Sequence, residues 1–232
     1  MVVTIVSLDG IPGAGKSKLL RELKSALHGI TSGNVVCLQE PVEEWSQMKD
    51  SQGKTLFSLY YNDQKRYALA FQLQVLHTRF ELLERTVMEH QGGEDTLILT
   101  ERDLTTDYRI FTQMLYDRGM FEEIEFRLYQ QVYESYQRRL QELCADGSQR
   151  LRERVNKRIY LTTSPTVAHR RMMSRGRAEE KNVPLEYLEA VDRYHKGLFS
   201  NGMPRVLKLS GDDDWETMPS RVFDEVVGFL LF

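Results

Sequence analysis

Eight residues near the amino terminus constrain the fold of this chain more than any other feature. They run from Gly10 to Ser17, in the order Gly-Ile-Pro-Gly-Ala-Gly-Lys-Ser, and match the pattern G-x-x-x-x-G-K-[S/T]. An apolar, β-branched run at 2–8 precedes them and a helical pattern follows, which is the context that a phosphate-binding loop requires. Glycine lets backbone N–H groups approach phosphate oxygens, and the helix amino terminus adds partial positive charge. The segment therefore predicts a nucleotide site between the first strand and the first helix.

The same motif predicts roles for single side chains. Lys16 would bridge the β- and γ-phosphates, and the Ser17 hydroxyl would ligate Mg²⁺. A glycine-rich turn without a ligand is the structural alternative. The residues that we expect around the phosphates are Gly10, Gly13, Ala14, Gly15, Lys16, Ser17 and Lys18.

Four further segments resemble the first strand, and helical patterns lie between them. Such alternation is typical of an α/β fold in which helices flank a parallel sheet. No repeat or linker divides the 232 residues, so we predict a single domain over 1–232. The predicted strands are 2–8, 34–40, 96–101, 157–162 and 205–210. The predicted helices are about 17–28, 64–91, 104–118, 121–145, 165–174, 184–200 and 217–230.

Two of the predicted helices are unusually long and carry apolar stripes. In 64–91 apolar side chains recur at steps of four and three, from Leu69 to Val87. In 121–145 a similar stripe runs from Ile124 to Leu143. Packing within one subunit explains most of each stripe. We also expect the two helices to pack against a second copy of the chain, which would make the protein a homodimer.

Composition excludes several other classes of protein. No apolar run approaches the ~20 residues of a membrane span, and the amino terminus has neither a signal-peptide nor a transit-peptide pattern. The two cysteines, Cys37 and Cys144, form no disulfide framework, and the five histidines lack metal-ligand spacing. We therefore expect a cytoplasmic protein, with or without a nuclear pool, that has no membrane partner.

Charge is unevenly distributed although the net charge is only −3. Basic side chains crowd the segment 150–181, where only three glutamates oppose them. Such a cluster indicates either an anionic ligand, polyphosphate or nucleic acid, or a solvated basic face.

The class of nucleotide-binding protein follows from what the chain lacks. A GTPase would need Asn-Lys-x-Asp, but Asn156-Lys157 is followed by Arg158 and Ile159. An ATP-driven machine would usually be larger. A small ATP-dependent kinase fits the length, and the basic segment then becomes a lid over the transferring phosphoryl group rather than a nucleic-acid site. A kinase that acts on a hydroxyl benefits from a carboxylate base, and Glu40, at the end of the second predicted strand, is a candidate for it.

Five short motifs occur in an order that resembles the deoxynucleoside kinase family, in its deoxycytidine and deoxyguanosine kinase branch. They are EPVEEW at 40–45, FQ at 71–72, ER at 101–102, RGRAEE at 175–180 and VPLEYLE at 183–189. The resemblance covers essentially the whole chain. It implies a five-stranded parallel sheet, a dimer built through long helices, and transfer of the ATP γ-phosphate to the 5′-hydroxyl of a deoxynucleoside.

The resemblance also implies roles around the reacting groups. Glu40 is the general base for the 5′-hydroxyl, Arg102 pairs with it, and Glu101 joins Ser17 around Mg²⁺. Arg171, Arg175 and Arg177 form the lid over the phosphates, at about 170–182, and share with Lys16 the stabilisation of charge. The loop at Asp212 and Asp213 lies against adenine, unless Asp212, Asp213 and Asp214 cap the last helix.

The remaining implied contacts concern the nucleoside. Tyr61 and Glu180 hold the sugar 3′-hydroxyl, Trp45 and Phe111 pack on the base, and Gln72 reads its edge. Three of these residues have a structural alternative: helix packing for Tyr61, core for Phe111, and a solvated pair with Lys181 for Glu180.

Two polar residues on the predicted helix 64–91 indicate which base the protein prefers. Gln72 and Arg79 are seven residues apart, close to two turns, so they project on nearly the same face with Val75 between them. Burying Arg79 needs a polar partner, which Asp107 can supply. Within the family such an Arg and Asp go with deoxycytidine and purine kinases, so we expect thymidine to be a poor substrate. The alternative is a structural salt bridge away from the base.

One residue departs from the family pattern. Asp103 stands where the family commonly has serine after the Glu-Arg pair. An extra negative charge there would weaken ATP binding unless it points away. Two functions remain open at this point besides deoxynucleoside phosphorylation: a thymidylate-type monophosphate kinase, which would not need Glu40, and a P-loop protein that binds nucleotide without turning it over.

Overall fold

A parallel five-stranded sheet forms the centre of the molecule, as the sequence predicts. The structure is a computed structural model that describes residues 3–27, 33–144, 157–200, 205–213 and 219–231. The strand order is β2-β3-β1-β4-β5, and every neighbouring pair is parallel. The strands are β1 (Val3–Asp9), β2 (Asn34–Leu38), β3 (Thr96–Glu101), β4 (Lys157–Thr162) and β5 (Val206–Ser210).

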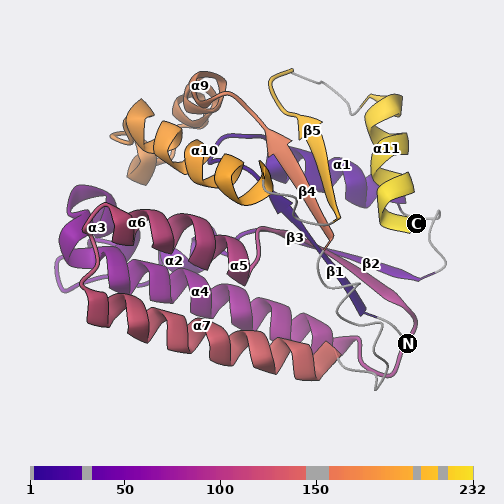
Figure 1. Ribbon diagram of the computed structural model, residues 1–232, viewed down its shortest axis with the longest axis horizontal. Helices are drawn as coiled ribbons and strands as arrows, with labels where there is room; N and C mark the ends of the chain where they lie inside the picture. The colour runs from indigo at the N-terminus through magenta and orange to yellow at the C-terminus, as the bar shows by residue number, and fades with distance from the viewer. Residues whose placement is uncertain (1–2, 28–32, 145–156, 201–204, 214–218, 232) are drawn as a thin grey trace.

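Helices cover both faces of this sheet (Figure 1). The long α-helices are α1 (Lys16–Leu27), α4 (Gln64–Glu89), α7 (Glu123–Cys144), α9 (Pro165–Arg175), α10 (Leu185–Ser200) and α11 (Ser220–Leu231). The shorter segments are α2 (Val42–Trp45), α3 (Leu56–Asn62), α5 (Leu104–Thr106), the π-helix η1 (Asp107–Thr112), α6 (Gln113–Asp117) and the 3₁₀-helix η2 (Ala178–Glu180).

Alternate residues of β1 explain why its sequence is continuously apolar. Val3 and Ile5 pack in the same cluster as Leu76 and Leu83 of α4. Val6 and Leu8 pack in the cluster that contains the buried residues of α1. The strand is therefore buried on both faces, as parallel strands under helices usually are.

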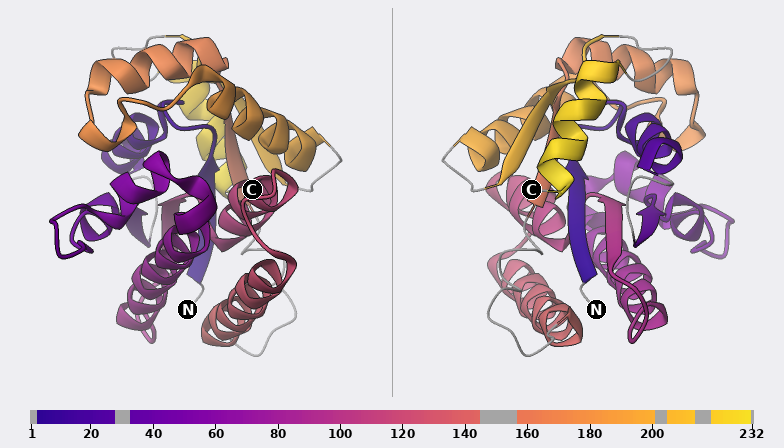
Figure 2. Two further views of the ribbon diagram at one scale, coloured as in Figure 1. Left: turned by 90° about the vertical axis from the view of Figure 1, so that its left-hand side faces the viewer. Right: turned by 90° about the vertical axis from the view of Figure 1, so that its right-hand side faces the viewer.

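The two long helices α4 and α7 lie side by side and run in the same direction (Figures 1 and 2). Lys65 at the start of α4 donates to Glu122 just before α7, and Gln91 just after α4 donates to the Leu143 carbonyl. Between these ends, Phe80 stacks on Tyr136 with ring centroids 4.0 Å apart. Packing within the chain thus uses the α4 stripe and the later part of the α7 stripe. Ile124 and Leu128, at its start, stay 74% and 47% exposed.

The structure corrects several predicted boundaries. The second strand ends at Leu38, so Glu40 lies two residues beyond it, in the turn before α2. The predicted helix 104–118 is three consecutive segments, because a π-helical turn at Asp107–Thr112 interrupts it. The helices α2, α3 and η2 were not predicted. All three are too short for apolar periodicity to reveal them; α3 begins where the Thr55 hydroxyl caps the Ser58 N–H.

The carboxyl ends of the parallel strands meet at one edge, and this edge carries the candidate site. The segment after β1 is the glycine-rich loop, the segment after β3 contains Arg102, and α9 follows β4. Ligands in open α/β sheets bind at this edge. Arg150, Arg152 and Arg154 of the basic segment, and Asp214, lie outside the described residues. Among the described residues, no helix combines the length and apolar character needed to cross a membrane.

Candidate active site

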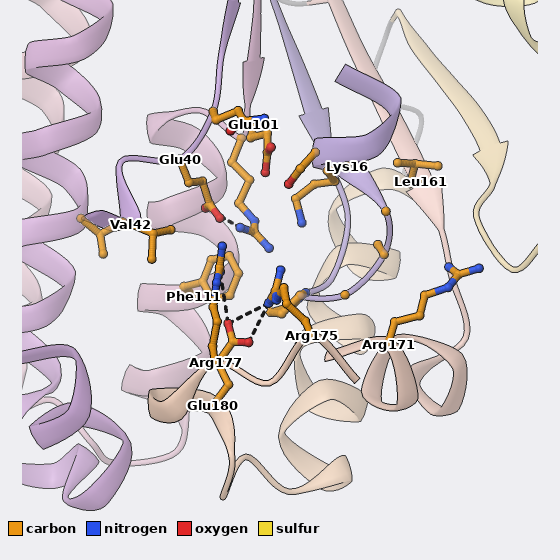
Figure 3. Close-up of a pocket in the computed structure, with 18 of the residues that line it drawn as sticks. Lys16, Glu40, Val42, Glu101, Phe111, Leu161, Arg171, Arg175, Arg177 and Glu180 are labelled. Atoms are coloured by element: carbon orange, nitrogen blue, oxygen red, sulfur yellow. Dashed lines mark hydrogen bonds and ion pairs between the residues drawn. The ribbon is translucent and has the colours of Figure 1, made fainter. Parts of the chain in front are cut away.

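A cavity of about 490 Å³ opens at the carboxyl edge of the sheet. Its lining includes the glycine-rich loop, the carboxylates and arginines after β2 and β3, and the arginines of α9 (Figure 3). Aromatic side chains from α2, α3, α4 and α10 complete it. One cavity therefore has an anion-binding end and an apolar, aromatic end.

The glycine-rich loop has backbone angles that suit glycine. Gly10, Gly13 and Gly15 all have positive φ, of 149°, 82° and 100°. At Gly13 a Cβ atom would lie 2.2 Å from the Ala168 carbonyl oxygen of α9, so a side chain there would displace the backbone of α9. The loop then continues directly into α1, whose amino terminus favours anions.

Lys16 is buried and turned back onto its own loop. Its ammonium donates to the Gly10 and Ile11 carbonyls, both at 3.1 Å. Burial, with a further contribution from Arg102, lowers the pKa of Lys16 to about 7. The cation is therefore poorly stabilised in the ligand-free site, and an incoming phosphate would supply the missing negative charge.

Glu40 is held between two guanidinium groups. Arg102 Nη1 and Arg79 Nη2 both donate to its Oε1, the latter at 2.9 Å. Burial alone would raise the pKa of Glu40, but Arg102, Arg79 and Lys16 together hold it well below its usual range. The carboxylate thus stays ionised, and Figure 3 shows it directed into the cavity.

Arg102 reaches Glu40 from an unusual backbone conformation. Its φ is +60°, in the left-handed region, which costs an L-residue about 1–2 kcal/mol. Its N–H donates to the Leu8 carbonyl at 3.0 Å, and its Nη2 donates to the Gly10 carbonyl at 3.0 Å. The guanidinium also lies over the Phe111 ring, 4.9 Å from the centroid. Arg102 thus joins β1, the glycine-rich loop and Glu40.

The predicted Arg79–Asp107 pair is present and fully buried. Arg79 Nε donates to Asp107 Oδ2 at 2.7 Å, and Nη1 donates to the Glu101 carbonyl at 2.5 Å. Burial raises the pKa of Asp107 to about 6, against the opposing effect of Arg79. Asp107 and Gln72 line the cavity, whereas Arg79 is not among the lining residues and lies behind them. Arg79 therefore connects the carboxylates of Asp107 and Glu40 to the backbone carbonyl of Glu101.

Aromatic rings make the apolar end of the cavity. Trp45 is fixed by a hydrogen bond from its indole N–H to Thr78 at 3.0 Å, and it packs edge-on against Phe57 and Phe71. Tyr61 and Phe111 are half-buried cavity residues. Sequence reasoning missed the other lining rings, which are Phe57, Tyr60, Phe71 and Tyr187. Their positions along α3, α4 and α10 match ordinary core packing, so no local signal distinguished them.

Two of the expected lid arginines form a charged cluster with Glu180. Arg175 Nη2 donates to both carboxylate oxygens of Glu180, at 2.8 and 2.7 Å, and Arg177 lies 3.4 Å from Oε1 (Figure 3). Glu180 is 4% exposed, so the alternative of a solvated pair with Lys181 is wrong. The two arginines are over a third exposed and can change partners.

Arg171 and the aspartates after β5 form a separate group at the rim of the cavity. Arg171 donates to the carbonyls of Gly211, Asp212 and Asp213, at 2.5, 3.1 and 3.2 Å. The Asp212 carboxylate accepts the Ser164 N–H at 2.7 Å, just before α9, so this residue does not cap the last helix. Asp213 lines the cavity. The expected lid arginine at position 171 thus braces the loop predicted to lie near adenine.

The residues present fit a magnesium ion bound largely by phosphates. Glu101 Oε1 is buried and has no hydrogen-bond partner among the described residues. Ser17 lines the same cavity as Glu101. No group of three or more His, Cys, Asp or Glu side chains in the described part of the chain could hold a metal alone. Mg²⁺ prefers few protein ligands, such as one carboxylate and one hydroxyl, and completes its coordination with phosphate oxygens and water.

Asp103 does not add charge to the cavity. Its carboxylate accepts from Arg158 Nη1 at 3.0 Å and Nη2 at 2.5 Å, and it caps α5 through the Thr106 N–H. Burial would raise the pKa of Asp103, but Arg158 outweighs burial and lowers it. Asp103 therefore points away from the cavity, and the expected weakening of ATP binding has no structural basis.

A family model and several known proteins similar to this chain point to the same family. The family model described as "Deoxynucleoside kinase" matches residues 6–230. A fowlpox virus protein named "Probable deoxycytidine kinase" is 30% identical over 215 residues, which cover 90% of this chain and 80% of that protein. Human mitochondrial thymidine kinase 2 is 27% identical over 221 residues, 93% of this chain and 73% of its own length. Mouse deoxycytidine kinase is 27% identical over 221 residues, 89% of this chain and 78% of its own.

Proposed function

Because the chain belongs to the deoxynucleoside kinase family, we propose that it transfers the γ-phosphoryl group of ATP to the 5′-hydroxyl of a deoxynucleoside. The observation that carries the proposal is the position of Glu40. An ionised carboxylate lies in the same cavity as the glycine-rich loop, between Arg102 and Arg79. A monophosphate kinase would place a cation there to meet an acceptor phosphate, and Glu40 would repel that phosphate.

Glu40 orients the hydroxyl before it accepts the proton. With its pKa held low, the carboxylate is a strong hydrogen-bond acceptor but a weak base for a free hydroxyl. In a loose phosphoryl-transfer transition state the nucleophile needs little deprotonation until its bond to phosphorus forms. The proton therefore passes to Glu40 late, after the 5′-oxygen has begun to bond. Arg102, which contacts Glu40, keeps that carboxylate in place.

Lys16 and the lid arginines meet the charge of the triphosphate. Lys16 leaves the Gly10 and Ile11 carbonyls for the β- and γ-phosphates, and the backbone N–H groups of the loop hold the β-phosphate. Arg175 and Arg177 turn toward the transferring group. Ser17 and Glu101 would hold Mg²⁺, which neutralises charge on the β- and γ-phosphates when bound. Asp213 and the loop braced by Arg171 lie near the adenine.

The nucleoside occupies the aromatic end. Tyr61 and Glu180 receive the 3′-hydroxyl, Trp45 and Phe111 pack on the base, and Gln72 with Asp107 reads its edge. Asp107 presents an acceptor to an exocyclic amine, and Arg79 fixes it. Deoxycytidine and purine deoxynucleosides carry such an amine, whereas thymine carries a carbonyl and a methyl group. We therefore propose the amine-bearing deoxynucleosides as substrates, while the relatives' names include both deoxycytidine and thymidine kinases.

The chain works as one kinase domain over 1–232, and we propose that two copies form a dimer. Ile124 and Leu128 lie one turn apart on α7 and are largely exposed. Met88, 52% exposed, lies on α4 beside α7. Burying such side chains against a second copy removes apolar surface from water.

The test is a substrate panel combined with one substitution. Purified protein is assayed with ATP and Mg²⁺ against the four deoxynucleosides and their 5′-monophosphates. We expect phosphorylation of nucleosides and not of monophosphates. Glu40→Gln keeps the shape but loses the proton acceptor, so turnover should fall by about 10²–10⁴-fold with little change in nucleoside binding. Wild-type turnover by Glu40→Gln, or a preference for monophosphates, would contradict the proposal.

A further inference from the structure

A second ionic cluster lies next to the active site but outside its cavity. Arg158 of β4 donates to Asp103 at 3.0 and 2.5 Å and to Asp9 of β1 at 3.3 Å. Thr106 joins the two aspartates, since its hydroxyl contacts Asp9 and its N–H donates to Asp103 at 2.9 Å. Asp9, Asp103 and Arg158 are not among the described residues that line the cavity. These side chains therefore neutralise one another and do not contact the cavity.

The cluster fixes the residue before the glycine-rich loop and the residue after Arg102. Asp9 is the residue before Gly10, and Asp103 is the residue after Arg102. The side chains of Asp9 and Arg158 are 0% and 4% exposed, so water cannot easily replace their contacts. Arg158 of β4 thus connects the end of β1, where the glycine-rich loop begins, to the segment just after β3, which contains Arg102.

Arg102 lies between two anchored neighbours. Glu101 is fixed by its pairing with Leu8 in the sheet, and Asp103 by Arg158 and the cap on α5. The chain between them turns through the left-handed conformation at Arg102, with φ of +60°. Without a glycine at this position, the conformation persists only where the surroundings impose it. That conformation directs the guanidinium toward Glu40 and the Gly10 carbonyl.

We propose that Asp103 and Arg158 are positioning residues for phosphoryl transfer. They hold Arg102 in its left-handed conformation, and through Arg102 they orient Glu40 for the acceptor hydroxyl. This inference rests on the proposed function for its reaction, but its geometry can be tested separately. Neither residue is among those that line the cavity.

The proposal predicts a loss of turnover rather than of ATP binding. Asp103→Ala removes both the ion pair and the cap, whereas Asp103→Asn keeps an acceptor for the Thr106 N–H but removes the charge. A small misplacement of a catalytic group can cost up to about 100-fold in rate. We expect kcat to fall about 10- to 100-fold in Asp103→Ala, with Asp103→Asn between it and the wild type. The KM for ATP should change by less than about threefold, because the loop and Lys16 remain.

A matched control separates positioning from general stability. Asp63 is also an aspartate that caps a helix, since its carboxylate accepts the Arg66 N–H at 3.1 Å at the start of α4. Asp63→Ala should lower the melting temperature without lowering kcat. If Asp63→Ala and Asp103→Ala reduce kcat equally, loss of stability explains both and the proposal is wrong.

A double-mutant cycle tests whether Asp103 acts through Arg102. If it does, Asp103→Ala lowers kcat in the wild type but by less than about twofold in an Arg102→Ala background. If Asp103→Ala reduces kcat by the same factor in both backgrounds, it acts independently of Arg102 and the proposal is overturned.

A crystal structure of Asp103→Ala gives a readout that needs no turnover. We expect Arg102 to leave the left-handed region or to lose its contact with Glu40. An unchanged Arg102–Glu40 contact overturns the inference even if the protein phosphorylates nucleosides. A displaced Arg102 in a protein that does not phosphorylate nucleosides would support the positioning role and contradict only the proposed function.

Discussion

The Arg79–Asp107 pair offers the sharpest test of base selection. The paired substitution Arg79→Met with Asp107→Ala removes both members of a buried ion pair and leaves an apolar surface. Thymine would then meet no unmatched carboxylate, and its methyl group would gain space. We expect the ratio of kcat/KM for thymidine to that for deoxycytidine to rise at least ~10-fold, about 1.4 kcal/mol.

The contacts of Arg79 show why a ratio must be measured. Arg79 also donates to Glu40 at 2.9 Å and to the Glu101 carbonyl at 2.5 Å. A hydrogen bond to a charged group contributes about 1.5–3 kcal/mol, so the variant should lose about 10- to 100-fold in turnover on every nucleoside. That loss is common to both substrates and cancels in the ratio. Arg79→Met alone should be the least stable variant, because an unpaired buried charge costs about 3–5 kcal/mol.

The assay is direct competition between labelled thymidine and deoxycytidine. A matched control is Arg139→Met with Glu84→Ala, which removes an ion pair of 2.8 Å between α7 and α4 far from the base. This control should leave the ratio unchanged. If the Arg79–Asp107 variant also leaves the ratio unchanged, the pair is structural and does not read the base. A wild-type protein that prefers thymidine would equally refute the reasoning.

Four further predictions concern the charges and the exposed surfaces. Since the pKa of Lys16 is lowered to about 7, the unfolded state binds its proton more tightly, and the ligand-free protein should gain stability as the pH rises from 7 toward 10.5. For the same reason ATP binding near pH 8.5 should take up close to one proton, measured by calorimetry in buffers of different ionisation enthalpy; equal uptake by Lys16→Met would contradict this. Arg175→Ala should cost about 2–4 kcal/mol of transition-state stabilisation, measured as kcat/KM, while nucleotide still binds; an unchanged kcat/KM would make the basic cluster a solvated face. Ile124→Lys with Leu128→Lys should convert a dimer to a monomer in analytical ultracentrifugation, and a monomeric wild type would end the dimer proposal.

Patterns that are local in sequence predicted the sheet and the loop correctly. A strand buried on both faces must be continuously apolar, and Val3 to Leu8 shows this without any tertiary information. The seven-residue spacing of Gln72 and Arg79 likewise predicted that they share one face of α4, because helix geometry alone fixes this; the structure shows that both are buried. The meeting of Arg79 with Asp107 also followed, since an arginine on such a face requires an acidic partner.

Contacts between distant segments were not predictable in the same way. Arg158 looked like one more member of a basic cluster, yet it is 4% exposed and binds Asp9 and Asp103. Its neighbours along the chain carry no sign of this, because the partners come from β1 and the end of β3. Tyr187 was not predicted for a similar reason. A tyrosine on α10 reaches the cavity only because α10 meets α3, where the Tyr187 and Tyr60 hydroxyls lie 3.4 Å apart. Long-range pairing therefore limits what sequence alone reveals of this site.

The charges of the site indicate how one cavity can accept both substrates. Arg79 and Arg102 are already committed to Glu40 and Asp107, so they cannot neutralise a triphosphate. Three cations that line the cavity can change partners: Lys16, now on backbone carbonyls, and Arg175 and Arg177, both now on Glu180. In the proposed reaction a nucleoside 3′-hydroxyl donates to Glu180 and so competes with Arg175 for that carboxylate. In that reaction the nucleoside would free Arg175 for the phosphates, so that the charge of this arginine becomes available when the acceptor is in place.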